Sequence, residues 1–237
     1  MRVFPFDRPT NYNEMLNKIG LFTFIEALLL TLLLGWASPQ AGRLLASYAI
    51  PIKVFSVELP LLYVVPAVII ALIARILKLH NRVSDFFGVR GTFDLYRVLM
   101  PLAGALGVAV DGPLRARLAQ QRKSVMQATF YRFASFEEPK ISKALVLSAI
   151  DCWTWYWILS ELLVLLAVTG ALLLFLRVFT VAAYVFLGIW LMTILFCSCY
   201  RVCGAMVDHQ ISEMILDPER VHTLQEEFRR LVSEPKT

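Results

Sequence analysis

Two glutamates are the residues of this sequence best placed to do chemistry, because each interrupts a long apolar stretch. Glu26 lies within residues 20–36 and Glu161 within residues 153–175. An ionisable group inside a membrane span costs about 2.5–3.5 kcal/mol on insertion scales, so it normally faces a protein interior or water. Arg75, near the end of residues 59–77, is a geometrically feasible ion-pair partner. In an oligomer, one glutamate could instead line a cation pathway; otherwise each carboxyl is protonated or bonded to a neighbouring helix.

The cysteines are a second set of residues with chemical potential. Cys199 and Cys203 are four residues apart and share a helix face, and together with Cys152 or His209 they could ligate a metal. The spacing matches no standard zinc pattern, and the sequence contains no C-x-x-C pair. We therefore interpret these cysteines as packing residues and predict neither a metal nor a cofactor.

Catalytic motifs are absent from the sequence. It contains no H-E-x-x-H, no G-x-S-x-G, no Walker loop and no dinucleotide-binding glycine pattern. We therefore expect a protein that is not an enzyme.

The composition indicates the environment in which these residues act. The chain has 237 residues, of which 58% are hydrophobic and 17% charged, and its mean hydropathy is +0.65. Soluble domains are nearer 45–50% apolar and about 25% charged. These numbers exclude an ordinary soluble domain and predict an all-α integral membrane protein.

Four segments approach the roughly 20 apolar residues that a helix needs to cross a bilayer. They are residues 20–36, 59–77, 153–175 and 178–199, and they predict a four-helix transmembrane bundle. Three tryptophans and a tyrosine between Trp153 and Trp157 are typical of an aromatic belt at a membrane interface. Small residues four apart in these segments permit close helix contact, within one chain or in a homo-oligomer.

Basic residues set the predicted orientation. Twenty of the 23 Lys and Arg residues fall in residues 1–19, 75–152 and 200–237, whereas the two other links hold three. The positive-inside rule therefore places both termini and the middle segment in the cytoplasm, next to the inner membrane. Disulfides are not expected on that side.

The middle segment, residues 78–152, predicts a basic helical layer. Asp94 is a candidate cap for a helix from Leu95, and residues 95–110 are too short and broken for a span, which favours a buried or re-entrant helix. A basic amphipathic helix follows from Pro113, a residue suited to the first helical position, to about Tyr131. Its charges are Arg115, Arg117, Arg122 and Lys123. This helix is interpreted as solvated, lipid-bound or docked to an acidic partner; direct nucleic-acid contact is not expected, since no nucleic-acid-binding motif accompanies it.

The tail predicts a second helix after Asp217-Pro218-Glu219, which is a typical helix start. Its apolar residues repeat at three- and four-residue intervals, forming a stripe of Val221, Leu224, Phe228 and Leu231. The stripe must be buried against the middle segment, a second copy or another protein.

The sequence thus divides into a cytoplasmic N-terminus (1–19), a transmembrane hairpin (20–77), a cytoplasmic segment (78–152), a second hairpin (153–199) and a cytoplasmic tail (200–237). We expect a non-enzymatic membrane scaffold or sensor that recruits a cytosolic protein through the basic helix and the tail stripe, as a homo-oligomer. The alternatives are an oligomeric pore or membrane-disrupting effector of the bacterial toxin or antiviral-defence type, and a small transporter.

Overall fold

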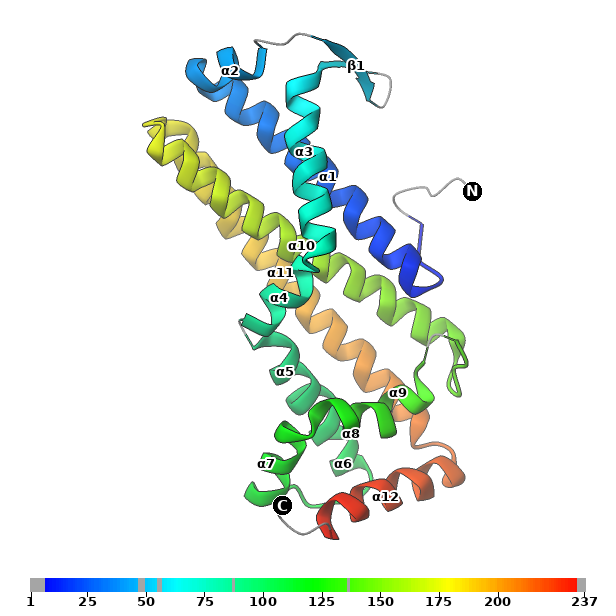
Figure 1. The fold of residues 1–237 in the computed structure, drawn as a ribbon. Helices are drawn as coiled ribbons and strands as arrows, with labels where there is room; N and C mark the ends of the chain where they lie inside the picture. Colours follow the sequence, from blue (N-terminus) through cyan, green and yellow to red (C-terminus); the bar gives the residue numbers. More distant parts are fainter. Residues whose placement is uncertain (1–6, 47–49, 55–56, 87, 136, 234–237) are drawn as a thin grey trace. The chain divides into compact units, whose positions relative to one another are not determined.

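The computed structural model describes residues 7–46, 50–54, 57–86, 88–135 and 137–233, which are helical apart from one pair of short strands (Figure 1). The elements of the N-terminal part are α1 (Tyr12–Ala37), α2 (Pro39–Ala46), β1 (Pro51–Val54), β2 (Val57–Pro60), α3 (Leu61–Ile76) and α4 (Leu79–Phe86). Next come α5 (Val89–Phe93), the π-helical segment η1 (Asp94–Leu99), α6 (Met100–Ala105), α7 (Gly112–Gln120), α8 (Arg122–Ala128) and α9 (Phe130–Phe133). The last three helices are α10 (Lys143–Phe175), α11 (Phe179–Met214) and α12 (Pro218–Ser233).

Three described helices, α1, α10 and α11, are long and apolar enough to cross a membrane. A fourth such element exists if α3 and α4 count as one span, since they are bent by 61° at the break between them. At this break Lys78 adopts a left-handed conformation with φ 48°, which an L-residue rarely does inside a helix. The all-helical class is therefore confirmed, whereas the number of spans is three or four.

The link between α1 and α3 contains more structure than the sequence suggested. After α2, strands β1 and β2 pair antiparallel, with Pro51 opposite Pro60 and Val54 opposite Val57. Short strands of this kind depend on cross-strand partners rather than on a strong local pattern, which explains why the hairpin was not predicted.

The chain forms two compact units. Unit 1 comprises residues 1–7, 13–82 and 154–199, and unit 2 comprises residues 8–12, 83–153 and 200–237. Helices α10 and α11 each contribute residues to both units. Unit 1 thus contains the four predicted spans almost entirely, and unit 2 contains most of the predicted cytoplasmic segments.

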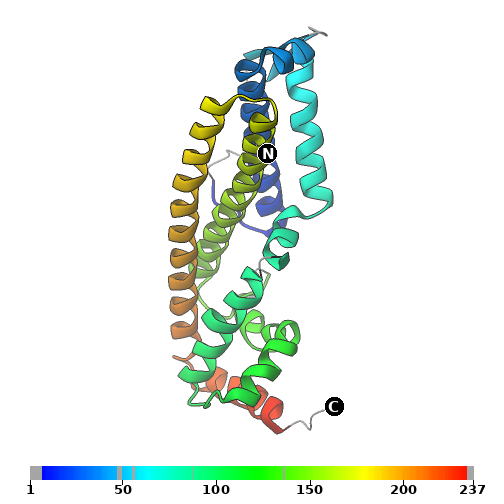
Figure 2. The same cartoon turned by 90° about the vertical axis from the view of Figure 1, so that its left-hand side faces the viewer.

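Small residues allow the helices of unit 1 to pack closely (Figures 1 and 2). Ala27 of α1 and Ala67 of α3 are at most 1% exposed and lie in one apolar cluster with side chains of α10. A second cluster joins α10 to α11 through Leu173, Ala182 and Val185. Contact between helices at small residues is typical of packing inside a membrane.

One side of α11 in unit 1 is apolar and exposed. Its exposed large side chains are Phe179, Tyr184, Phe186, Leu187, Trp190, Leu191, Ile194 and Leu195. A contiguous apolar face of this kind normally contacts lipid or another protein.

In unit 2, residues 89–105 form one bent helical run through α5, η1 and α6. The prediction that Asp94 caps a helix from Leu95 is wrong, because the run already begins after the left-handed Gly88 and Asp94 lies inside it. Leu99 and Leu102 are fully buried in unit 2, as expected for a buried helix. The helix ends at Ala105, however, rather than at residue 110.

Two predicted helix starts in unit 2 are confirmed. Asp111 accepts a hydrogen bond from the Leu114 backbone N–H at 2.8 Å and caps α7. Pro218 is the first residue of α12, and the Asp217 carboxylate accepts from the Glu219 backbone N–H at 3.0 Å. The predicted basic helix is divided, however, into α7, α8 and α9.

Candidate functional site

Unit 1 contains a group of polar side chains among its apolar helices, which we call the buried polar cluster. It consists of Lys18, Thr23 and Glu26 of α1, His80 of α4 and Glu161 of α10. All five are buried, with exposed fractions between 1% and 8%. Burying so many polar groups is costly unless they bind one another or a ligand.

Glu161 is held from two sides. The Thr23 hydroxyl donates to one of its carboxylate oxygens, Oε2. The other oxygen, Oε1, lies 3.5 Å from Nδ1 of His80. Thr23 Oγ1 is also 2.9 Å from the Ile19 carbonyl, so its single proton has two acceptors available. Each carboxylate oxygen of Glu161 therefore has a polar side chain next to it.

Glu26 is held much less well. It follows Thr23 by three residues, on the same face of α1 from which the Thr23 hydroxyl contacts Glu161. Its Oε2 atom is buried, and within the described ranges it has no hydrogen-bond partner. Nε2 of His80 is likewise buried and has no hydrogen-bond partner among the described residues. Buried polar atoms without partners are rare in native proteins and indicate a functional role or a bound group.

Lys18 brings a positive charge into the same unit. Its Nζ donates to the Asp7 carbonyl oxygen at 3.1 Å and lies 4.6 Å from the ring centroid of Trp155. The His80 ring lies 5.6 Å from that of Trp157. Tyr156 and Trp157 are buried in unit 1, and Trp155 is half-buried. The aromatic belt at a membrane interface stays a prediction.

The structure brings Glu26 and Glu161 together but leaves Arg75 apart from them. Arg75 is exposed near the end of α3, and the basic side chain in contact with Glu161 is His80. Sequence analysis gave His80 no role, because its partner lies 81 positions away. The position of His80 just after the end of a predicted span was the only sequence feature pointing to it.

The basic candidates of unit 2 divide into two groups. Arg115 and Lys123 are exposed, and Arg117 is half-buried. Arg122 forms an ion pair within unit 2, since its Nη1 lies 2.9 Å from Oδ2 of Asp94. Burial raises the pKa of the Asp94 carboxyl, and the guanidinium groups of Arg122 and Arg90 act in the opposite direction.

The tail stripe is buried within unit 2. Leu224 and Phe228 are fully buried, and Val221 is half-buried. The neighbouring Gln225 donates from Nε2 to the Leu106 carbonyl oxygen at 3.1 Å. The side chain of Leu231 lies outside the described residues. The two central residues of the stripe are thus not exposed for a separate partner.

Comparison with protein families matches residues 11–221 to the YmfE protein family. The chain belongs to this family. No curated protein and no solved structure matches the chain. The matched region includes every residue of the buried polar cluster, and the family description states no activity.

The buried polar cluster has the groups of a short proton relay. Thr23, Glu161 and His80 are consecutive neighbours, and each can both give and accept a proton. At 3.5 Å the contact between Glu161 and His80 is long for a hydrogen bond, so a small movement would be needed to join them. The unpartnered atoms of Glu26 and His80 are further positions for a proton or a small cation.

Proposed function

We propose that this protein is a multi-pass membrane protein that carries protons through the buried polar cluster. The observation that supports this function best is the set of contacts around Glu161, which is 1% exposed and lies between a threonine hydroxyl and a histidine. Carboxylate and histidine chains inside membrane spans are the usual components of proton relays in pumps and transporters. A purely structural cluster would more commonly satisfy all of its buried polar atoms, and this one does not.

The membrane arrangement proposed is the four-span topology with both termini in the cytoplasm. It is supported by the three long apolar helices, the bent α3–α4 pair and the exposed apolar face of α11. In this topology Glu26 and Glu161 lie roughly 9–12 Å from the cytoplasmic face, at 1.5 Å of rise per residue. His80 follows the break at the cytoplasmic end of α3 and would receive protons from that side.

The test is proton flux into liposomes containing the purified full-length protein. A trapped pH-sensitive dye reports internal pH after a potassium gradient and valinomycin impose a membrane potential. We expect protein-dependent proton flux that falls at least tenfold in Glu161→Gln, because the amide cannot take up and release a proton. The matched control is Glu14→Gln, at a half-buried position of α1 outside the buried polar cluster.

Two results would contradict the proposed function. One is flux no greater than in protein-free liposomes, with the protein shown to be folded and inserted. The other is equal flux in Glu161→Gln and in the wild type.

Partner recruitment is a second candidate function, favoured by the exposed charges of Arg115 and Lys123. The tail stripe no longer supports it, because Leu224 and Phe228 are covered by unit 2 itself. A scaffold of this kind would use the basic face of unit 2 alone. Pull-down with the full-length protein, compared with an Arg115→Glu, Lys123→Glu variant, tests it; equal capture by both would count against it.

A further inference from the structure

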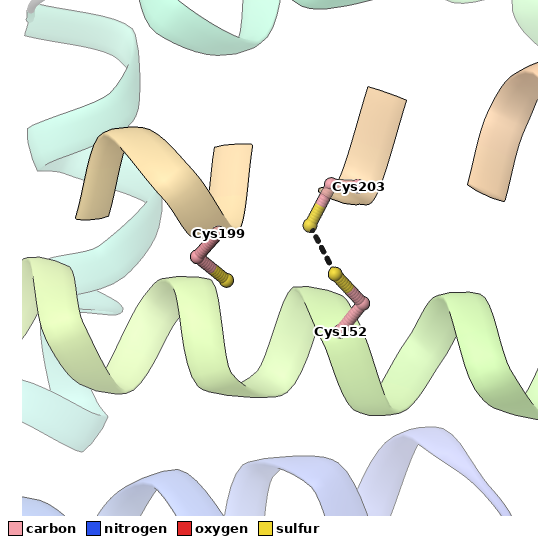
Figure 3. Close-up of side chains that lie close together, drawn as sticks. All are labelled: Cys152, Cys199 and Cys203. Atoms are coloured by element: carbon pink, nitrogen blue, oxygen red, sulfur yellow. Dashed lines mark hydrogen bonds between the residues drawn. The ribbon is translucent and has the colours of Figure 1, made fainter. Parts of the chain in front are cut away.

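A pair of cysteines far apart in sequence comes together in unit 2. The Sγ atoms of Cys152 in α10 and Cys203 in α11 lie 2.7 Å apart, and Figure 3 shows the two side chains pointing toward each other. Cys203 is 1% exposed, whereas Cys152 is half-buried, so the pair is shielded on one side and accessible on the other. None of the four cysteines of the chain is in a disulfide.

The surroundings hold the two thiols in place. Phe93, itself 1% exposed, packs edge-on against Trp153, the residue after Cys152, with ring centroids 4.5 Å apart. It also packs against Tyr200 on α11, at 5.3 Å. These ring contacts join α5 to α10 and α11 next to the cysteine pair.

A basic side chain lies near the residue that follows Cys203. The guanidinium carbon of Arg97 is 3.7 Å from where a Cβ would stand on Gly204. Since Gly204 has no side chain, the guanidinium can lie close to the backbone of α11 at this point. A positive charge on this turn of the helix raises the local potential in the direction that favours thiolate over thiol.

We propose that Cys152 and Cys203 form a binding site for a thiophilic metal ion. The bound ion is Cu(I), and the two cysteine sulfur atoms are its ligands. Soft thiolate ligands select soft ions such as Cu(I), and two-thiolate coordination needs no carboxylate or histidine. With metal–sulfur bonds of about 2.3 Å, as for zinc, the sulfur atoms can be up to about 4.6 Å apart. The thiols must therefore separate modestly on binding, by rotation about their Cα–Cβ bonds.

The chemistry of binding is a ligand exchange without oxidation or reduction. Two S–H bonds break, two sulfur–copper bonds form, and two protons leave to solvent, so the complex with Cu(I) carries one negative charge. Affinity should accordingly fall as the pH is lowered.

Sequence spacing alone did not establish this site. Sequence analysis considered Cys152 with Cys199 and Cys203 as metal ligands and set the idea aside, because their spacing matches no standard motif. Metal motifs are recognised by ligands a few residues apart, whereas Cys152 and Cys203 are separated by 51 positions. The two cysteines meet because α10 and α11 run antiparallel next to each other.

The test uses the full-length protein in detergent, reduced and kept free of oxygen, titrated with Cu(I) against a chromophoric chelator. We expect one tightly bound Cu(I) per chain, with affinity lowered at least tenfold in Cys203→Ser. Cys152→Ser should behave in the same way, and it provides the comparison if the buried Cys203→Ser variant fails to fold. The matched control is Cys197→Ser, at an exposed position of the same helix, which should bind as the wild type does.

Three results would overturn the proposal. Equal Cu(I) affinity in Cys152→Ser, Cys203→Ser and the wild type would exclude the pair as ligands. An equal loss in Cys197→Ser would indicate nonspecific thiol binding. Failure to bind Cu(I), with a mild oxidant joining Cys152 to Cys203, would identify the pair as a redox dithiol instead.

Discussion

Replacing Glu26 by methionine should stabilise unit 1, although the substitution removes a carboxyl group from its candidate site. Glu26 is 8% exposed and its Oε2 atom is buried without a described hydrogen-bond partner. Methionine is unbranched, apolar and a good helix former, so it can fill the same space without this cost.

The magnitude follows from the unsatisfied group. A buried polar atom without a partner costs about 1–3 kcal/mol, so Glu26→Met should gain about 2 kcal/mol. For chains of 150–250 residues, 1 kcal/mol shifts the melting temperature by about 2–4 °C, which gives a rise of about 4–8 °C. Asn17→Met, at an exposed position of the same helix, should change stability by under about 0.5 kcal/mol and the melting temperature by about 2 °C or less.

The assay is thermal unfolding of the full chain in detergent, followed by tryptophan fluorescence. Four of the five tryptophans belong to unit 1, and only Trp153 belongs to unit 2, so the emission reports mainly on unit 1. The reasoning would be refuted if Glu26→Met lowered the melting temperature, or if both substitutions raised it equally.

Three further predictions concern unit 2. Arg122→Met leaves the buried Asp94 carboxylate without its ion-pair partner and should lower the free energy of unfolding by about 3 kcal/mol. Lys123→Met, at the exposed next position, should lower it by under about 0.5 kcal/mol. Equal losses for the two variants in thermal unfolding would contradict this prediction. Phe228→Ala should cost about 3–5 kcal/mol and expose α12 to trypsin, and unchanged cleavage would show that the tail packs elsewhere. Burial raises the pKa of the Asp94 carboxyl above 3.8, so protonation of this group favours the folded state. The stabilisation by protonation is complete below pH 3.8 and is lost as the pH rises through the raised pKa. Asp94→Asn should therefore flatten the pH dependence of the melting temperature, and a constant difference from the wild type would refute the shift.

Local chemistry made several elements predictable from the sequence. A helix start is set by neighbouring residues alone, because a capping side chain or a proline acts on the free N–H groups of the first turn. This is why the start at Asp217-Pro218 and the helix start near Pro113 were predicted correctly, although Asp111 was not named as the cap of α7. The long apolar helices were predictable for the same reason, since length and hydropathy are properties of one segment. Asp94 has the same residue type but lies inside a helix that Gly88 already begins, so type alone was misleading.

Long-range pairing accounts for what the sequence did not reveal. The contacts of Glu161 with Thr23 and His80 join residues 138 and 81 positions apart. Sequence analysis singled out the two glutamates because each interrupts a long apolar segment. It offered Arg75 as their partner because only positions along the predicted spans could be compared. Which side chains face one another depends on helix rotation, and the weak amphipathicity of such apolar helices leaves that rotation undetermined.

The two glutamates should respond to substitution in opposite ways, and this difference separates a proton pathway from a structural cluster. Glu161 contacts Thr23 and His80, so replacing its carboxyl group with an amide weakens these contacts and should lower stability. The Oε2 atom of Glu26 has no hydrogen-bond partner among the described residues, so replacing Glu26 with methionine should raise stability. If Glu26→Met also reduces proton flux, the cost of burying Glu26 serves transport, as strained or unsatisfied groups often do at functional sites. The alternative outcome is that Glu161→Gln lowers proton flux only as far as it lowers stability, and that Glu26→Met leaves the flux unchanged. In that case the buried polar cluster holds α1, α4 and α10 together, and the proton pathway lies elsewhere.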